Sequence, residues 1–170
     1  VFLLARPELR GKVRGWVSIQ GALLGTPVAD YIAASPKLDA LAAKLLSLLG
    51  GTVESLYSMT TAAAREFCRK NDGAIRELIG SLPAIAFASW KDPAPGPPNS
   101  LLAIPRNIMA RQGIKNDGLM PAANAVLPGM DFVMAAGVDH ADPAMRSLQD
   151  YDRLRLTKTL LSLLLRRVEP

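Results

Sequence analysis

The segment from Leu82 to Trp90, LPAIAFASW, constrains the fold of this chain more than any other feature. It has the length of a strand and is almost wholly apolar, so polar and apolar residues do not alternate along it. A strand of this kind is typical of a parallel sheet covered on both faces by helices, because neither of its faces meets water. The sequence therefore predicts an α/β fold with this segment as a buried strand.

Two further segments have strand character, and helical patterns separate the three. In parallel sheets of this kind, the chemistry sits in loops beyond the carboxyl ends of the strands. The two loops that contain Asp117 and His140 are therefore the candidate site. The predicted strands are 13–20, 83–90 and 131–137, the predicted helices are 3–10, 38–49, 62–69, 74–79, 101–112 and 151–168, and a turn is predicted at 71–73.

Composition favours one soluble globular domain over residues 1–170. Hydrophobic residues make up 49% and charged residues 21%, which are ordinary values for a globular protein. The net charge of +5 is spread along the chain, and aromatic residues are only 5%, so we expect no nucleic-acid partner. No apolar run reaches the 18 or so residues that a membrane span needs, and no feature assigns a compartment.

The chain has one cysteine, Cys68, and one histidine, His140. These counts exclude an intrachain disulfide and metal sites built from several cysteines or histidines, and we expect no metal and no cofactor. Cys68 lies near Arg65, Arg69 and Lys70, cations that would lower the pKa of a thiol, but nothing else supports a reactive cysteine.

Asp117 and His140 have the residue types and the order of an acid and base pair. They are 23 residues apart, with the predicted strand 131–137 between them. Histidine takes up and releases protons near neutral pH, and a carboxylate on its other ring nitrogen holds the tautomer and stabilises the imidazolium. On one fold of this type, the catalytic residues follow each other as serine, acid and histidine.

The stretch from Gly113 to Pro143, GIKNDGLMPAANAVLPGMDFVMAAGVDHADP, resembles the corresponding segment of bacterial triacylglycerol lipases and esterases of the α/β-hydrolase superfamily. Asp117 falls on the acid of their Asn-Asp-Gly-Leu-Val motif, and His140 on the base of their His-x-Asp motif. VSIQGALLGTPVAD resembles their run ending Gly-Ser-x-x-Ala-Asp. The resemblance implies the C-terminal part of an α/β-hydrolase parallel sheet that acts on an ester or lipid-like substrate, with a helical lid at residues 30–80.

The sequence departs from that family because it contains no Gly-x-Ser-x-Gly, the turn that presents the nucleophile. We therefore expect the serine to lie outside these residues and this chain alone to be inactive. We also expect strand 13–20 to pair with an absent strand or with a second copy of the chain. Ser18 is the alternative nucleophile within the chain, but it lacks the tight glycine turn, and a strand serine is favoured.

Several residues have two interpretations. Asp142 matches a position where some of these lipases bind calcium, but a helix cap is favoured because no dense carboxylate loop is visible. Asp139 is a reserve candidate for the orienting acid. The leucines of 151–168, flanked by arginines and a lysine, fit packing on the sheet better than a membrane-surface helix. The leucine stripe of 38–49 is either core or the apolar face of a lid.

A non-catalytic function is the alternative to the ester hydrolase. In this interpretation, the chain is a half-domain that binds a partner chain or an apolar ligand and exposes the open edge of its sheet.

Overall fold

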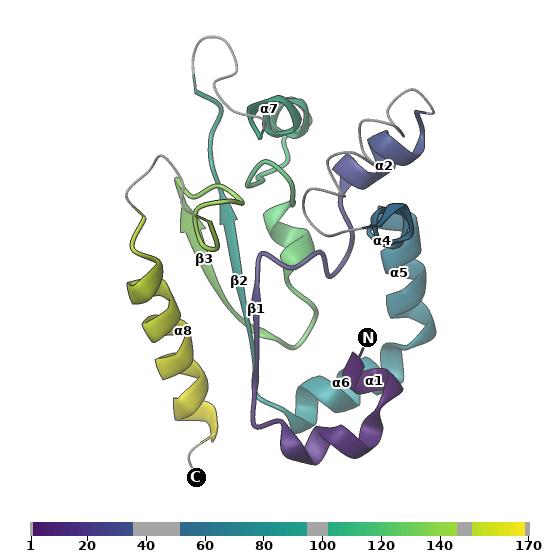
Figure 1. The fold of residues 1–170 in the computed structure, drawn as a ribbon, viewed down its shortest axis with the longest axis vertical. Helices are drawn as coiled ribbons and strands as arrows, with labels where there is room; N and C mark the ends of the chain where they lie inside the picture. Colours follow the sequence, from purple (N-terminus) through teal and green to yellow (C-terminus); the bar gives the residue numbers. More distant parts are fainter. Residues whose placement is uncertain (1, 36–51, 95–101, 146–150, 169–170) are drawn as a thin grey trace.

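The computed structural model describes residues 2–35, 52–94, 102–145 and 151–168 (Figure 1). Its centre is a parallel three-stranded sheet in the order β1-β2-β3. The strands are β1 (Trp16–Ile19), β2 (Ala84–Trp90) and β3 (Asp131–Ala136). All three predicted strands, and with them the α/β fold, are confirmed.

Helices surround this sheet and connect its strands. The predicted helix 38–49 lies outside the described residues. The described helices are α1 (Phe2–Ala5), α2 (Pro27–Ala33), α4 (Val53–Ser58), α5 (Thr61–Lys70), α6 (Asp72–Ser81), α7 (Ala103–Arg111) and α8 (Arg153–Val168), with 3-10 turns η1 (Pro7–Lys12) and η2 (Ala122–Ala125).

The central strand β2 is buried along almost its whole length, as its apolar sequence predicts. Ile85 and Phe87 face a cluster that includes residues of α8. The alternate residues are alanines, and Ala84 and Ala86 pack against Leu127, Met130 and apolar side chains of α6. Full burial of one side chain of the size of Phe87 stabilises the fold by about 1.5–3 kcal/mol. The small residues on the other face let the chain approach the sheet closely.

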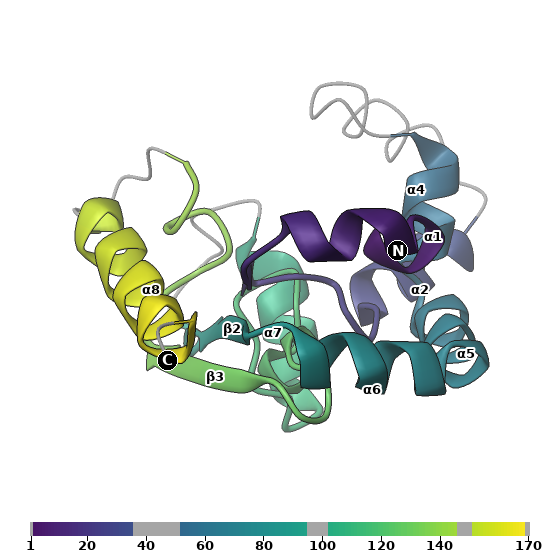
Figure 2. The ribbon, with the colours of Figure 1, turned by 90° about the horizontal axis from the view of Figure 1, so that it is seen from below.

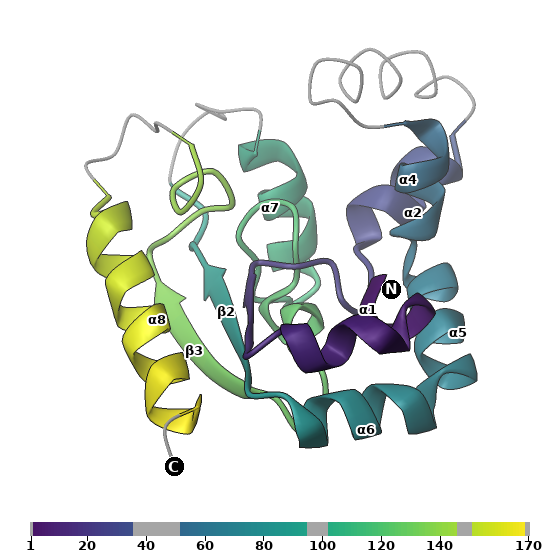
Figure 3. The same cartoon turned by 60° about the horizontal axis from the view of Figure 1, so that its bottom comes forward.

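Helix α8 packs one face of its leucines against the sheet, which is the interpretation that the sequence favoured. Leu160 is almost completely buried with Ile85 and Phe87, and Leu156, Leu163 and Leu164 pack around them. Figure 2, which views the molecule from below, shows α8 next to β3, and Figure 3 shows the same helix beside β3 with α6 at the bottom of the view.

The structure differs from the sequence prediction in two places before β2, at the predicted helix 3–10 and at the predicted turn 71–73. The predicted helix 3–10 breaks into α1 and η1, because Pro7 has no N–H to donate and its ring disfavours a helical residue before it. The predicted turn at 71–73 is wrong, since α6 already begins at Asp72. Asn71 alone makes the corner, and its side-chain amide closes α5 by donating to the carbonyl of Phe67.

Helix α2 was not predicted from the sequence. Thr26 caps it by accepting a hydrogen bond from the N–H of Val28 at 3.2 Å, and Pro27 occupies the first turn. A threonine followed by a proline is a helix-start signal that could have found α2.

Strand β1 lies at one edge of the sheet. Its neighbour is β2, with the N–H of Trp16 donating to Pro83 and that of Gln20 donating to Phe87. Within the described part of the chain, no strand pairs with its other side. The sheet is thus open at the place where the sequence predicts a further strand, whose identity stays a prediction.

None of the described helices is both long enough and apolar enough to cross a membrane.

Replacing Leu160 with alanine tests the packing of α8. Leu160 is buried at the centre of its cluster, so Leu160→Ala should lower the free energy of unfolding by about 2–5 kcal/mol, measured by urea denaturation. Leu161→Ala is the matched control, because Leu161 is 47% exposed, and its effect should stay within about 0.5 kcal/mol. Equal losses in both variants would contradict this packing.

Candidate active site

The loop that carries Asp117 is a tight turn held by its neighbours. The side-chain oxygen of Asn116 accepts from the N–H of Gly118 at 2.9 Å, and its amide donates to the carbonyl of Ile114 at 2.9 Å. Gly118 has φ +105, and a Cβ there would lie 2.9 Å from the Cβ of Leu102. Only glycine therefore suits this position, and the Asn-Asp-Gly sequence serves the turn as well as the site.

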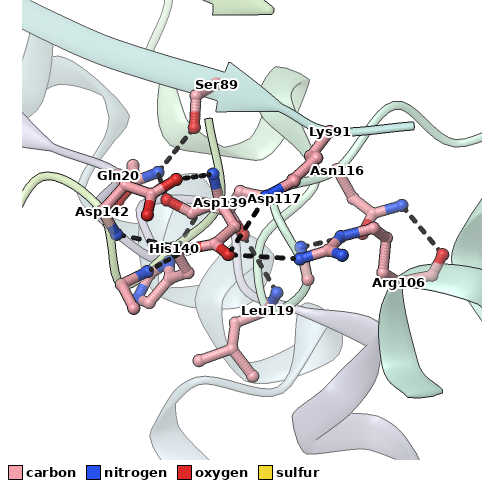
Figure 4. Close-up of polar contacts among 12 residues, drawn as sticks. Gln20, Ser89, Lys91, Arg106, Asn116, Asp117, Leu119, Asp139, His140 and Asp142 are labelled. Atoms are coloured by element: carbon pink, nitrogen blue, oxygen red, sulfur yellow. Dashed lines mark hydrogen bonds and ion pairs between the residues drawn. The ribbon is translucent and has the colours of Figure 1, made fainter. Parts of the chain in front are cut away.

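The two carboxylate oxygens of Asp117 have different partners. Oδ1 accepts hydrogen bonds from the N–H groups of Leu119 at 2.9 Å and Met120 at 2.7 Å. Oδ2 lies 2.9 Å from Nδ1 of His140. The Asp117 side chain is only 1% exposed, so its carboxylate is fixed inside the protein by these three contacts (Figure 4).

His140 follows β3 in a loop that the sheet positions. Gly137 has φ +79 and turns the chain, and the next residue, Val138, is buried against the α8 side of the sheet. The backbone N–H of His140 donates to the carbonyl of Asp117 at 2.9 Å, so the two residues are joined through both backbone and side chains. The predicted proximity of Asp117 and His140 is what the structure shows.

The arrangement leaves one imidazole nitrogen available for chemistry. An ionised carboxylate only accepts hydrogen bonds, which assigns the ring proton to Nδ1 and makes Nε2 a proton acceptor. The side chain of His140 is 32% exposed, and among the described residues no hydrogen bond engages Nε2. The pair can therefore take a proton from a group that reaches Nε2, with Asp117 stabilising the imidazolium.

Asp139 is not the acid that orients the imidazole. Its carboxylate lies 3.6 Å from Nη2 of Arg106 and 3.7 Å from Nζ of Lys91. Its Oδ1 accepts the N–H groups of Ala141 and Asp142 in its own loop. The reserve assignment to Asp139 is wrong, because these cations and N–H groups occupy the carboxylate.

Asp142 is fully buried and does not cap α8, so the favoured interpretation of this residue is wrong. Its Oδ2 accepts the N–H of Asp139 at 2.9 Å. Helix α8 begins at Arg153, and Asp152 accepts the N–H of Arg155 there.

Burial raises the pKa of the Tyr151 hydroxyl, and the charge of Asp142 adds to that rise.

The described residues hold no group of three or more His, Cys, Asp or Glu side chains placed to bind a metal ion.

Ser18 and Cys68 do not join the pair. Ser18 is a buried residue within β1, and its Oγ lies against Gly21. Burial raises the pKa of the Cys68 thiol, the opposite of what its neighbouring cations would do. The Cys68 Sγ donates instead to the carbonyl of Leu23 at 3.6 Å, so an activated thiol is contradicted.

Three residues of this region were missed by the sequence analysis. Gln20 at the end of β1 and Arg106 on α7 are each 4% exposed, and both contact Asp139. Ser89 on β2 accepts a hydrogen bond from the Gln20 amide. A glutamine directly after a strand is a weak signal, and nothing in the sequence distinguishes Arg106 from a surface arginine.

Solved structures resemble this chain over nearly its whole length. The mature form of a lipase from Bacillus licheniformis has a TM-score of 0.69 and 21% identity, and the match covers 95% of this chain and 58% of that chain. A metagenomic carboxyl esterase has a TM-score of 0.73 and 22% identity, covering 97% of this chain and 52% of that chain. The propeptide form of the Bacillus licheniformis lipase matches with a TM-score of 0.69 and 18% identity over 96% of this chain and 32% of that chain.

The fold is that of an α/β-hydrolase. The chain spans about half the length of the first two structures and corresponds to only part of their fold. The α/β-hydrolase resemblance that the sequence motifs carried is therefore confirmed for the fold. No protein-family model matches the chain, and a search of curated proteins gives no match.

Two variants of Asp117 separate its structural contacts from its contact with His140. Asp117→Ala removes the acceptor of two N–H groups at a buried turn and should lower the free energy of unfolding by about 1–3 kcal/mol. Asp117→Asn keeps one oxygen that can accept both N–H groups, so its free energy of unfolding should fall clearly less in the same urea titration. Equal stability of Asp117→Ala and the unchanged protein would show that the Oδ1 contacts do not support the turn.

Proposed function

We propose that Asp117 and His140 are the acid and base of a Ser-His-Asp triad in a carboxylic-ester hydrolase, whose serine lies outside these 170 residues. The observation that carries the proposal is the 2.9 Å contact between Asp117 Oδ2 and His140 Nδ1, with Nε2 left to face a reacting group. The lipase and carboxyl esterase with similar structures support an ester as the substrate class.

The proposed reaction divides the chemistry between this chain and the serine. The serine oxygen attacks the ester carbonyl while Nε2 of His140 takes its proton, and Asp117 stabilises the imidazolium. His140 then delivers the proton to the leaving alcohol, which leaves an acyl-enzyme. Water attacks this acyl group with His140 again as base, and the serine is restored.

We also propose that residues 30–80 form a lid-like cover that supplies apolar surface to the acyl chain. An apolar cavity of about 440 Å³ lies between β1 and the helices of this segment. Met59, Phe67, Leu78 and Ile79 of the segment line it, together with Trp16 and Leu23 near β1. A cavity of this size and character suits an apolar group. Residues 36–51 of the segment lie outside the described part.

A half-domain that binds a partner chain is the second candidate, and one observation favours it. The outer side of β1 is unpaired within the described residues, and an unpaired strand edge readily accepts another strand. The two proposals agree if the strand added at β1 belongs to the part that carries the serine.

Substitutions in the full-length protein test the assignment of acid and base. His140→Ala should lower kcat for a p-nitrophenyl ester by about 10³-fold or more, because the nucleophile loses its base. Asp117→Asn should lose much of the same factor, because the amide favours the wrong imidazole tautomer. Ser18→Ala is the matched control and should retain kcat, since Ser18 lies within β1. Near-native turnover in His140→Ala would refute the assignment.

Labelling with a fluorophosphonate probe tests where the nucleophile lies. The probe phosphonylates an activated serine, and peptide mapping of the labelled full-length protein should place the adduct outside residues 1–170. His140→Ala should abolish labelling, because the serine is then no longer activated. An adduct on Ser18, or on any other serine of this chain, would contradict the proposed position of the nucleophile.

A further inference from the structure

Asp139, the residue bonded directly to His140, is held from both its backbone and its side chain. Its N–H donates to Oδ2 of Asp142 at 2.9 Å, and its carbonyl accepts from Nε2 of Gln20 at 3.1 Å. Its Oδ2 faces Arg106 and Lys91. Groups from the ends of β1 and β2 and from α7 therefore converge on the residue that directly precedes His140 in the chain (Figure 4).

Gln20 makes its contact from an unfavourable backbone conformation. Its φ is +49, the only positive φ among the described residues other than glycine, and its side chain is 4% exposed. A glutamine in the left-handed region persists only where the surroundings determine it, and such residues gather at functional sites. Its N–H donates to Phe87, and its side-chain amide donates to both Ser89 and the carbonyl of Asp139. The strained residue thus bridges β1, β2 and the loop of His140.

Arg106 ties α7 to both loops of the acid and base pair. It is 4% exposed, and its ion pair within the described part of the chain is with Asp139, at 3.6 Å. Its carbonyl accepts the side-chain amide of Asn116 at 3.3 Å, one residue before Asp117. A buried guanidinium needs a counter-charge, so moving Asp139 away from Arg106 would leave a buried charge without its partner.

We propose that Gln20 and Arg106 are positioning residues that hold the Asp139–His140 segment so that Nδ1 of His140 stays on Asp117. This inference rests on the proposed function only in giving His140 the role of base. Among the described residues, neither side chain forms a hydrogen bond or ion pair with the imidazole, so each acts through Asp139. A displacement of about 1 Å in a catalytic group costs up to about 10²-fold in rate, and preventing it is the task of these contacts.

The test compares Gln20→Met and Arg106→Met with matched surface controls in the full-length protein. Both variants keep side-chain length and lose the donor or the charge. We expect kcat for a p-nitrophenyl ester to fall by about 10- to 100-fold with KM changed less than about twofold, since the substrate is not contacted. Arg106→Lys keeps the charge and should recover part of the loss. The controls Arg155→Met and Arg167→Met change two exposed arginines of α8, of which Arg167 forms an exposed ion pair with Asp131, and should retain kcat.

Proton NMR of His140 gives a readout that needs no substrate. The Nδ1 proton, assigned by its loss in His140→Gln, should be shifted downfield and protected from exchange with water in the unchanged protein. In Gln20→Met and Arg106→Met, it should move toward the shift of a solvated imidazole and exchange faster, while the two surface controls leave it unmoved. Gln20→Gly removes the side chain but relieves the backbone strain. If this variant also loses the Nδ1 proton signal, the Gln20 side chain, and not its backbone conformation, positions His140.

The two readouts separate this inference from the ester hydrolase proposal. If the unchanged protein hydrolyses no ester but the His140 signal depends on Gln20 and Arg106, the positioning role stands and the proposed function fails. If ester turnover is present and both the signal and kcat are unaffected in Gln20→Met and Arg106→Met, the positioning role is overturned. If a methionine variant does not fold, the signal and kcat of the milder Gln20→Gly and Arg106→Lys variants decide in the same way.

Discussion

The burial of β2 on both faces is the constraint on which the rest of this structure depends. On one face, Ile85 and Phe87 pack against α8. On the other face, Ala84 and Ala86 pack against α6 and against Leu127 and Met130, which follow η2. A strand buried in this way must be central, so β1 and β3 lie beside it in parallel. Their carboxyl ends then open at one edge of the sheet. The polar groups of the site meet at that edge because they follow the carboxyl ends of parallel strands arranged around the apolar central strand β2.

Asp117 supplies the second constraint by using its two oxygens for different tasks. Oδ1 accepts the N–H groups that close its own turn, and Oδ2 faces the imidazole. The backbone contact from His140 to Asp117 joins the same two residues again. A carboxylate held by its own turn needs little reorganisation when the imidazole becomes charged, which is the property that acid and base catalysis requires.

Local signals in the sequence predicted the parts of the fold and site that depend on neighbouring residues. The apolar run 82–90 gave the correct central strand, and Asn-Asp-Gly located the turn of Asp117. Predictions failed where a distant partner decided the outcome. Asp142 has the chemistry of a helix cap, but the N–H of Asp139 holds it in the loop.

The sequence by itself determined the three strands, the helix that covers them and the two residues, Asp117 and His140, that we propose as acid and base, because periodicity and turn chemistry act over short stretches of chain. Only the tertiary structure decided which groups surround that pair. Gln20 meets the carbonyl of Asp139 from 119 residues away, and Arg106 meets its carboxylate from another element. Neither contact leaves a local pattern, because each arises only when the strands and α7 have packed together and excluded water from the charges between them.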